Sequence, residues 1–456
     1  MAERHLLLNA FDMNTVGHLC HGLWRHPRDQ SAQYHLPHYW EDLALTLEKG
    51  LFDGLFLADG LGMYDVYGDG PEAALAAAIQ VPRNDPMLIV PLMSRVTSHL
   101  GFGITSNVTY EPPFLFARRM STLDHLTGGR VGWNIVTGYL NSAAHAMGKA
   151  AQLEHDHRYD RADDYLEALY KLWEGSWEEG AVVRDKQLGI FTDASKVHRV
   201  CHDGPYYKVD SMHLCEPSPQ RTPVLYQAGS SGRGLEFAAR HAECMFVMGP
   251  SKQFVGSTVK GIRASVANAG RRADSVRILA GINVVVGRTE KEALEKFADY
   301  RQYADPMAGL AHFSSSTGVD FAAYQLDEPI VFVKNDSSNS ALEAFTRKSP
   351  EKVWTVRALL EQMSLGSRTY TLVGSAEKVA DELIAWQREA GVDGFNVSRS
   401  VAPECYRDFT ELVVPELQAR GAFKTAYQEG TLREKLLGGV AHLDASHYGA
   451  QHRRLS

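Results

Sequence analysis

The chain has 456 residues, of which 44% are hydrophobic and 22% are charged, and its formal net charge is −8. This length allows a large core without disulfide bonds, and the acidic balance argues against nucleic acid or an anionic membrane as the main partner. The five cysteines are widely spaced with no Cys-x-x-Cys pair, which favours free thiols in a reducing compartment over disulfides or a thiolate zinc site. Without a signal-peptide pattern or a run near the roughly 18 apolar residues of a membrane span, we expect a cytoplasmic protein.

Short apolar runs alternate with helical patterns along the chain. The runs that predict strands cover residues 6–11, 54–59, 100–105, 130–137, 223–228, 244–248, 278–286 and 393–397. Between the first two runs, Trp40, Leu43, Ala44 and Leu47 follow the spacing i, i+3, i+4, i+7, and Gly50 ends this predicted helix. Eight strands alternating with helices favour an α/β fold of the (β/α)8 TIM-barrel type, with a doubly wound open sheet as the alternative.

Two stretches interrupt this alternation. Residues 175–221 are rich in Gly, Pro, His and charge, and we expect them to pack over the barrel. Residues 303–372 contain Ser-rich segments, and so long an insertion in a barrel is more often a lid or a binding loop than a linker. We therefore expect one barrel domain over residues 1–425 that carries both insertions, followed by a polar C-terminal extension over residues 426–456 that wraps a neighbouring subunit.

A Gly/Ser turn joins the fifth predicted strand to the helix pattern that follows it. The turn contains Gly229, Ser230 and Ser231. Glycine lets the backbone approach a ligand closely, Ser hydroxyls add donors, and the N–H groups and dipole of a helix N-terminus favour an anion. The turn is therefore compatible with phosphate binding, and equally with an ordinary N-capped helix after a strand.

Polar side chains stand at the carboxyl ends of several predicted strands, where barrel enzymes carry their sites. They are Asp59, Thr105, Ser106, Asn107, Asn134 and Thr137. Each has a structural alternative, because Asp59 can form a turn, Thr105 can cap the next segment, and Asn134 within a strand needs a buried partner. Since the ends of parallel strands converge on one mouth, we expect these groups to meet there.

Histidines gather in the loop after the first predicted strand. This loop holds His18, His21, Trp24, Arg25, His26, His35 and His38. Such a cluster can bind a metal, but no paired carboxylates stand at ligand spacing, so a substrate pocket lined by His and Trp is favoured and no metal site is predicted. His312, in the second insertion, would close over that pocket. His157 and Tyr159 stand before a helix pattern, where they form a solvated helix start or reach an anion or a flat ring.

Seven segments between about residue 5 and residue 400 together resemble a known family. They are residues 9–11, 24–27, 52–59, 121–130, 133–137, 157–159 and 227–231. They are similar to the nitrilotriacetate, dibenzothiophene-sulfone and dimethyl-sulfide monooxygenases, which are flavin-dependent relatives of bacterial luciferase. The opening residues 9–13 and the segment 24–27 look most like the dimethyl-sulfide members.

The resemblance implies a luciferase-like barrel that binds reduced FMN, supplied by a separate NAD(P)H:flavin reductase, and that uses dioxygen. It implies that the isoalloxazine and ribityl chain lie against Asp59, Thr105, Asn134 and Thr137. It further implies that the lower ribityl chain and the phosphate are held by His157, Tyr159, Gly229, Ser230 and Ser231. The phosphate interpretation of the Gly/Ser turn agrees with this placement.

The resemblance also implies a reaction: oxidation of a small organosulfur compound, similar to dimethyl sulfide, with cleavage of a C–S bond. The expected substrate pocket consists of Phe11, His21, Trp24, Phe56 and Phe246. We expect His18, His26 or His312 to move the proton, because imidazole titrates near neutral pH. The relatives further imply a homodimer or homotetramer.

Other functions stay open from sequence. The same chemistry on an amine polycarboxylate or an aromatic sulfone would use different pocket loops. A non-catalytic flavin-binding barrel, or a barrel aldolase or isomerase that holds a sugar phosphate, would use the same fold. Schiff-base chemistry needs a lysine at a strand end, and the eight predicted strands contain none, which argues against the aldolase.

Overall fold

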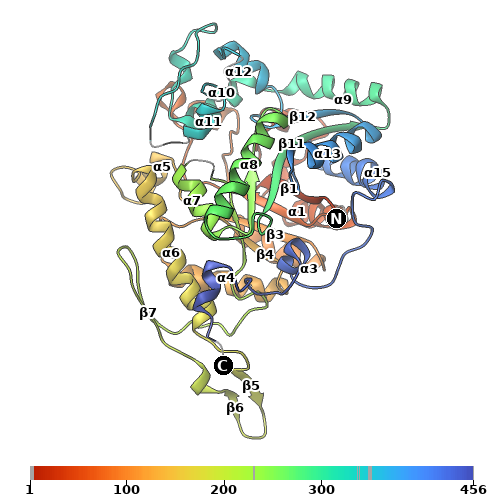
Figure 1. Ribbon diagram of the computed structural model, residues 1–456. Helices are drawn as coiled ribbons and strands as arrows, with labels where there is room; N and C mark the ends of the chain where they lie inside the picture. The colour runs from red at the N-terminus through yellow and green to blue at the C-terminus, as the bar shows by residue number, and fades with distance from the viewer. Residues whose placement is uncertain (1–4, 230–231, 336, 338, 348–351, 455–456) are drawn as a thin grey trace.

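The protein is described here by a computed structural model that covers residues 5–229, 232–335, 337, 339–347 and 352–454 (Figure 1). In this part of the chain, eight parallel strands form the central ring: β1 (Leu7–Met13), β2 (Gly54–Ala58), β3 (Gly101–Asn107), β4 (Val131–Val136), β9 (Val224–Gln227), β10 (Cys244–Val247), β11 (Arg277–Gly287) and β13 (Gly394–Ser398). Each strand pairs with the next in chain order, and β13 pairs with β1, so the ring is closed. The predicted TIM barrel is confirmed, and the open sheet is excluded.

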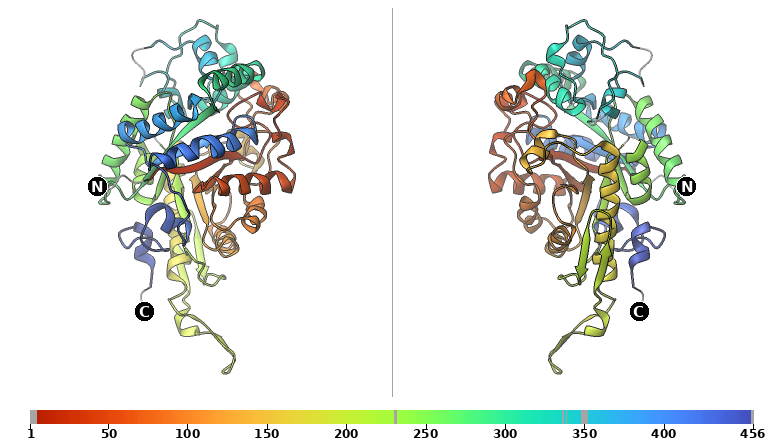
Figure 2. Two further views of the ribbon diagram at one scale, coloured as in Figure 1. Left: turned by 90° about the vertical axis from the view of Figure 1, so that its right-hand side faces the viewer. Right: turned by 90° about the vertical axis from the view of Figure 1, so that its left-hand side faces the viewer.

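Most helices surround the ring as an outer layer, while those of the second insertion and of the C-terminal extension lie at its two ends (Figures 1 and 2). The helices described are α1 (Pro37–Lys49), α2 (Glu72–Ala76), α3 (Val90–Val96), α4 (Pro113–Thr127), α5 (Asn141–Ala146), α6 (His155–Gly175), α7 (Gly232–His241), α8 (Lys252–Asn268), α9 (Glu290–Tyr303), α10 (Pro306–Thr317), α11 (Asn339–Glu343), α12 (Val356–Gln362), α13 (Ala376–Ala390), α14 (Glu404–Asp408), α15 (Val414–Ala419) and α16 (Leu432–Leu437). Helix α1 illustrates how the apolar spacing predicts a helix. Pro37 is its first residue, Trp40 and Leu47 are buried on its barrel face, and Gly50 follows its last residue.

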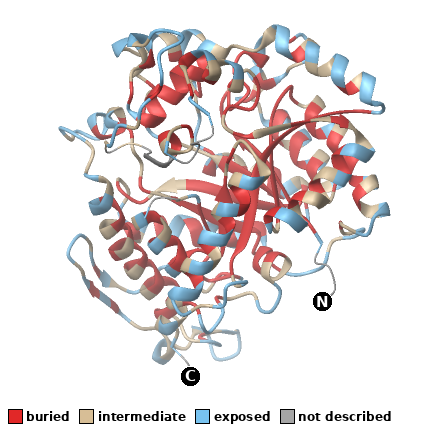
Figure 3. Cartoon of the chain, turned by 45° about the horizontal axis from the view of Figure 1, so that its top comes forward, coloured by how far each residue is buried: buried red, intermediate tan, exposed pale blue. Residues whose placement is uncertain are grey.

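The barrel interior is filled by side chains rather than left as a channel. Phe11, Phe56, Tyr226 and Phe246 belong to one apolar cluster inside the ring. The large rings fit because glycines on neighbouring strands leave room for them. A Cβ on Gly132 would lie only 2.5 Å from the ring of Tyr226, so no larger residue fits there. Figure 3 shows the buried residues concentrated in the strands and in the inward faces of the helices. The packed interior leaves space for ligands only at the ends of the barrel.

The first insertion forms two hairpins. One pairs β5 (Val182–Asp185) with β6 (Ile190–Thr192), and the other pairs β7 (Val200–Asp203) with β8 (Lys208–Ser211). The β5–β6 hairpin extends away from the barrel, at the opposite end of the molecule from α10 and α12 (Figures 1 and 2). The expectation that this insertion packs over the barrel is therefore wrong for β5–β6, whose apolar side chains stay exposed. Only the β7–β8 hairpin joins the core, through buried Val200 and Val209.

The second insertion builds a small core of its own above the barrel. Leu310 and Phe313 of α10 pack with Phe345, Trp354 and Leu359. Helix α10 also contacts α2, which belongs to the long connection after β2. A further strand, β12 (Tyr370–Ser375), follows the insertion and pairs in parallel with the second half of β11, outside the closed ring. The sequence pattern does not predict this strand, whose first residues fall within the range 303–372 expected for the insertion.

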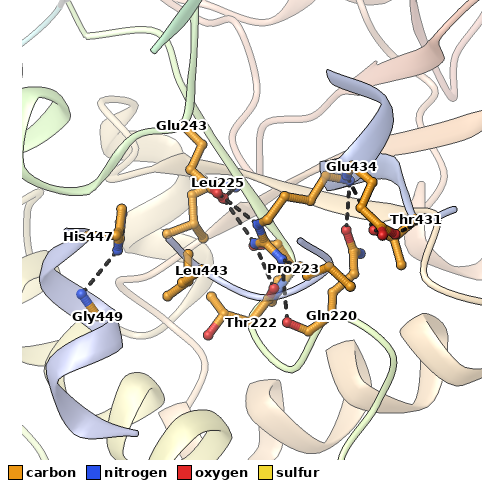
Figure 4. A network of polar contacts seen from close by, with 12 residues as sticks. Gln220, Thr222, Pro223, Leu225, Glu243, Thr431, Glu434, Leu443, His447 and Gly449 are labelled. Atoms are coloured by element: carbon orange, nitrogen blue, oxygen red, sulfur yellow. Dashed lines mark hydrogen bonds and ion pairs between the residues drawn. The ribbon is translucent and has the colours of Figure 1, made fainter. Parts of the chain in front are cut away.

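The C-terminal extension packs against its own barrel at the end opposite the second insertion (Figure 1). Leu432 and Leu436 of α16 join the apolar cluster inside the ring. Arg433 donates to the two carboxylate oxygens of Glu243, at 2.8 and 3.0 Å, and to the carbonyl oxygens of Thr222 and Pro223 (Figure 4). The extension therefore closes the amino end of the barrel. None of the helices described is both long enough and apolar enough to cross a membrane.

Candidate active site

A cavity of about 260 Å³ opens where β2, β3, β4 and β9 end. Asp59 is the first residue after β2, Thr105 lies near the end of β3, and Thr137 follows β4. These three residues line the cavity together with Tyr159 and Gly229. The structure therefore brings together five of the residues that sequence analysis assigned to a cofactor.

Asn134 lies beside this group inside the barrel. Its Nδ2 donates to Oγ1 of Thr105 at 2.9 Å, so the side chain is held in a fixed orientation. Its Oδ1 is buried and has no hydrogen-bond partner among the described residues. Asn134 is not among the residues that line the cavity, in contrast to its partner Thr105.

The cavity also has an end suited to an anion, where α6 begins and the β9–α7 turn passes. Gly229 lies against it, and a Cβ there would be 2.9 Å from the Tyr159 hydroxyl and 2.4 Å from Nε2 of Gln227. Arg158 adds a positive charge to the wall. The predicted Ser230 and Ser231 lie outside the described residues. A positive group beside a glycine turn at a helix start is compatible with a phosphate.

His157 does not line this cavity, whereas His155 does. The His157 side chain is 63% exposed and lies 3.8 Å from a carboxylate oxygen of Glu154. The reason is helical geometry: α6 begins at His155, so residues 155, 158 and 159 share one face and residue 157 points elsewhere. The spacing i, i+3, i+4 could have identified His155 and Arg158 from the sequence.

Asp59 is a half-buried carboxyl group at the mouth of the barrel. Its Oδ1 lies 3.5 Å from Nε of Arg83. Burial raises the pKa of Asp59 to about 6, against the lowering effect of the Arg83 charge. A second cavity, of about 330 Å³, borders Asp59, Tyr64 and Arg83 and adjoins the first. Asp59 can thus carry a proton close to physiological pH while it faces both cavities.

Three of the predicted histidines, from the first loop and the second insertion, lie close together, although none of them lines either cavity. His18, His21 and His312 are all buried. Nε2 of His21 lies 3.2 Å from Nδ1 of His312, so one of these rings donates to the other. The His312 ring packs on Tyr64, and the His18 ring packs on Phe11, with centroid distances of 4.9 and 4.5 Å. The structure therefore places these three imidazoles and the aromatic barrel interior in one region.

Two other members of the predicted His and Trp pocket lie elsewhere. His26 has Nε2 at 3.0 Å from Asp299 of α9, while its Nδ1 accepts from the backbone N–H of Arg28 at 3.2 Å. With both ring nitrogens engaged in this way, His26 anchors the first loop to α9. Trp24 is 37% exposed and is absent from the cavity walls. Phe11, Phe56 and Phe246, also expected in the pocket, pack against one another in the barrel interior and are likewise absent from the walls of both cavities.

Tyr64 and Gln80 belong to the same region, although sequence analysis did not assign them to the site. The Tyr64 hydroxyl donates to Oε1 of Gln80 at 2.6 Å, and Nε2 of Gln80 donates to the backbone carbonyl of His18 at 3.1 Å. Both residues stand in the long connection after β2, where no strand end and no regular spacing marks them. Their position follows only from the folded loop.

The buried imidazoles are neutral at pH 7. Burial lowers the pKa of His21 to about 4, and burial, followed by neighbouring positive charges, lowers the pKa values of His18 and His312 well below the ordinary value. These pKa values lie outside the neutral range that the sequence analysis assumed. A neutral imidazole still donates at one nitrogen and accepts at the other, so the three rings can orient a proton without carrying charge.

The pH dependence of the free energy of unfolding should show that His21 is neutral in the folded protein. At pH values below about 6.5, the ordinary pKa of histidine, His21 binds a proton in the unfolded chain but not in the folded protein. The stability that neutral His21 contributes is therefore full above about pH 6.5 and is lost as the pH falls towards 4. We expect the wild type to lose about 2 kcal/mol more than His21→Gln between pH 7 and pH 5. Urea unfolding over this pH range measures the difference.

The exposed His38 provides the control for this measurement, and His38→Gln should follow the wild type. Burial raises the pKa of Asp12 to about 6, so this residue changes the free energy of unfolding with pH in the opposite direction. Its effect is the same in all three proteins. Parallel curves for wild type and His21→Gln would show that His21 takes up no extra proton on unfolding.

Among the described residues, no group of three or more His, Cys, Asp or Glu side chains is arranged to hold a metal ion.

Comparison with known proteins identifies the class. A closed (β/α)8 barrel with a polar, anion-compatible cavity at its mouth is typical of barrels that bind a phosphorylated ligand. Residues 19–394 match the family model described as luciferase-like monooxygenase, so the chain belongs to this family and is a flavin-dependent monooxygenase. The resemblance found in the sequence is confirmed.

Three relatives place the chain within the family. It is 48% identical to the dimethyl-sulfide monooxygenase of Hyphomicrobium sulfonivorans, over 99% of this chain and 94% of that protein. It is also 48% identical to the long-chain alkane monooxygenase of Geobacillus thermodenitrificans, over 98% of each protein. A crystal structure of riboflavin lyase with modified FMN and riboflavin superposes with a TM-score of 0.93 at 36% identity, covering 99% of this chain and 100% of that one. Two relatives of equal identity act on different substrates, so the comparison alone leaves the substrate open.

Proposed function

We propose that the protein is the oxygenase component of a two-component monooxygenase that oxidises a small organosulfur compound with cleavage of a C–S bond. The observation that carries this proposal is the single cavity that joins an anion-compatible end, at Arg158 and Gly229, to strand-end polar groups at Asp59 and Thr105. The high identity to a dimethyl-sulfide monooxygenase favours the organosulfur substrate. Hydroxylation of an alkane is the second candidate, favoured by the equal identity to an alkane monooxygenase.

FMN fits the residues that are present. The glycine turn at Gly229 leaves room beside Tyr159, and Arg158 lies in the same cavity wall. We assign the phosphate to the end formed by Gly229, Arg158 and Tyr159, and the ring and ribityl groups to Thr105 and Asn134 with Asp59 and Thr137. Bound in reduced form, FMN would supply two electrons for the activation of dioxygen. The protein's contribution is to bind, orient and shield the reacting groups.

Water exclusion falls to the aromatic interior and to the second insertion. Phe11, Phe56 and Phe246 form an apolar wall in the barrel. Helix α10 brings His312 against His21, and the insertion's own core supports this helix. We propose that neutral His18 or His312 holds the proton that oxygen transfer requires, with Tyr64 as a neighbouring donor. Hydroxylation of the carbon beside sulfur gives an unstable adduct in which the C–S bond then breaks.

The proposed reaction needs partners. A separate NAD(P)H:flavin reductase would supply reduced FMN, in keeping with a relative named as component A of a nitrilotriacetate monooxygenase. We place the reaction in the cytoplasm, where NAD(P)H is available, and expect a homodimer or homotetramer. The exposed apolar side chains of the β5–β6 hairpin, among them Leu188 and Phe191, suit contact with a second subunit.

A coupled assay tests the proposed function. Purified protein, FMN, NADH, a flavin reductase and air are mixed with dimethyl sulfide, a sulfone, nitrilotriacetate or an alkane in separate reactions. Loss of the sulfide with little release of hydrogen peroxide is the expected result. His18→Gln and His312→Gln should each reduce turnover while FMN binding persists, whereas His26→Gln should lower thermal stability and leave turnover in place.

The outcomes separate the candidates. Consumption of the alkane alone would select the second candidate, and consumption of nitrilotriacetate or the sulfone would move the protein to those subgroups. Hydrogen peroxide released at the rate of the reductase alone, with every substrate intact, would refute the organosulfur proposal. Unchanged turnover in His18→Gln or His312→Gln would remove that residue from the proton pathway.

A further inference from the structure

The amino end of the barrel carries a cavity of its own. This amino-end cavity has a volume of about 290 Å³ and lies where β10 and β11 begin, between the loop that follows α8 and the C-terminal extension. Its walls include Glu243, Arg271, Ser275, Arg277 and Arg433. The cavity of the candidate active site lies where strands end, and the two cavities share no lining residue. A ligand bound at the amino end would therefore occupy a separate site.

Arginine is the main source of charge in the walls of the amino-end cavity. Four arginines line it: Arg271, Arg272, Arg277 and Arg433. Two histidines in the same walls are neutral at pH 7, because burial lowers the pKa of His447 to about 4 and the pKa of His442 below its ordinary value. Since the walls contain three carboxylates, positive charges exceed negative ones.

The three wall carboxylates are engaged by other groups. Glu243 accepts from Arg433 at 2.8 and 3.0 Å (Figure 4), and Asp274 pairs with Arg272 at 2.9 Å. The third, Asp444, accepts from the backbone N–H and the hydroxyl of a serine two residues further on, at 2.8 and 2.5 Å. The two ion pairs therefore cancel half of the arginine charge in the walls.

Arg271 lines the cavity and forms no ion pair with any residue that the structure describes. Its Nη1 donates to the carbonyl oxygens of Ala239 and Ala242, at 3.0 and 2.8 Å, and so caps the carboxyl end of α7. Its Nε and Nη2 make no hydrogen bond within the described part of the chain. Because a guanidinium carries N–H donors on each of its nitrogens, those on Nε and Nη2 are available to a ligand.

Ser275 gives a second, independent observation in the same wall. Its Oγ is sheltered from bulk solvent and has no hydrogen-bond partner among the residues described. The backbone N–H of Ser275 donates to the carbonyl oxygen of Arg272 at 2.9 Å, and this turn fixes the position of the side chain in the wall. A sheltered hydroxyl without a partner is costly, and an oxygen atom of a ligand would satisfy it.

The opposite wall belongs to the C-terminal extension. Arg277 donates to the carbonyl oxygens of Leu436 and Leu437, at 2.8 and 3.1 Å, and so ties the last turn of α16 to the start of β11. A Cβ on Gly438 or Gly439, which follow this helix, would meet nothing within 4 Å, so the rim of the cavity is open. A ligand in the cavity would contact the barrel and the extension at the same time.

We propose that the amino-end cavity binds a phosphate group, either as inorganic phosphate or as part of a small phosphorylated molecule. Guanidinium groups match the oxygens of a phosphate, and one phosphate has enough oxygens to accept from Arg271 and from Ser275 together. Because the ligand contacts both walls, its binding holds the extension on the barrel and stabilises the folded protein. The site is independent of the proposed function, since it lies at the other end of the barrel.

Titration calorimetry with inorganic phosphate and with ribose 5-phosphate tests for this site. The protein is first saturated with FMN, so that the anion-compatible end of the active-site cavity is occupied. We expect the wild type to bind these probes and Arg271→Met to bind them about tenfold more weakly, because hydrogen bonds from a charged donor are lost. Tighter binding of ribose 5-phosphate would identify a phosphorylated molecule as the ligand, and tighter binding of phosphate would identify the free ion.

A matched pair of substitutions at Ser275 keeps the test independent of the cap that Arg271 provides. Ser275→Asp places a carboxylate in the wall and should abolish binding of both probes, whereas Ser275→Asn has the same size without the charge and should retain most of it. Arg357→Met removes an exposed arginine of the second insertion, which pairs with Asp327, and should bind as the wild type does. Thermal unfolding checks that each variant is folded, and phosphate should raise the midpoint of the wild type but not that of Ser275→Asp.

Two results would overturn the inference. One is the absence of binding of either probe to the FMN-saturated wild type. The other is binding that stays unchanged in both Arg271→Met and Ser275→Asp, because the anion would then lie elsewhere on the protein.

Discussion

Arg433→Met is expected to lower the free energy of unfolding by about 3–5 kcal/mol, because it leaves the buried carboxylate of Glu243 without its partner. Arg433 also donates to the carbonyl oxygens of Thr222, Pro223 and Ala441, and these lose a donor at the same time. Urea unfolding followed by circular dichroism measures the change. The loss should be large because α16 is held at the amino end of the barrel by this side chain and by two leucines.

The double variant Arg433→Met with Glu243→Met separates the lost ion pair from the lost packing. Removing both charges should recover part of the stability, since no buried carboxylate is left unpaired. Arg272→Met is the matched control, because Arg272 lies at the same end of the barrel, is exposed and pairs with Asp274 at 2.9 Å. It should leave the unfolding midpoint unchanged. A midpoint for Arg433→Met equal to that of the control would show that the buried pair contributes nothing to the fold.

Gly229→Leu is expected to weaken the binding of FMN by about 100-fold or more, equivalent to about 2.8 kcal/mol. A side chain at this position meets Gln227 and the Tyr159 hydroxyl and fills the end of the cavity assigned to the phosphate. Quenching of FMN fluorescence or equilibrium dialysis measures the affinity. The substitution acts on the close approach of the backbone to the ligand, which only glycine permits.

Gly261→Leu is the control for steric bulk alone. Gly261 lies in α8, and a Cβ there meets nothing within 4 Å. This variant should bind FMN as the wild type does. Wild-type affinity in a folded Gly229→Leu variant would exclude the β9–α7 turn as part of the flavin site.

The barrel could be predicted from sequence because its signal is local. The strands of the ring are mostly apolar and mostly buried on both faces, and helical spacing separates them along the chain. Strand β12 was missed because it pairs on the outside of the ring, and its pattern is half polar. The projecting β5–β6 hairpin was misplaced because nothing local says whether a hairpin turns towards the barrel or away from it.

The candidate site was predictable where strand order alone decides position. Asp59, Thr105 and Thr137 converge because parallel strands end at one edge. His157 was assigned to the site in place of His155 because the assignment followed a family motif rather than the start of α6. The place of His26 could not be predicted for a different reason: its partner Asp299 stands far along the chain, and only the folded structure brings the two together.

The closure of the ring by its first and last strands has a consequence for biosynthesis. Strand β1 pairs with β13, whose residues begin at Gly394. At typical elongation rates of about 5–20 residues per second, β1 waits about 20–80 seconds on the ribosome before its second neighbour exists. One side of the first strand therefore stays unpaired through most of translation, while the β2 side forms early. The nascent chain must be kept from intermolecular strand pairing throughout this interval, so its yield in a cell depends on chaperone capacity as well as on the stability of the finished barrel.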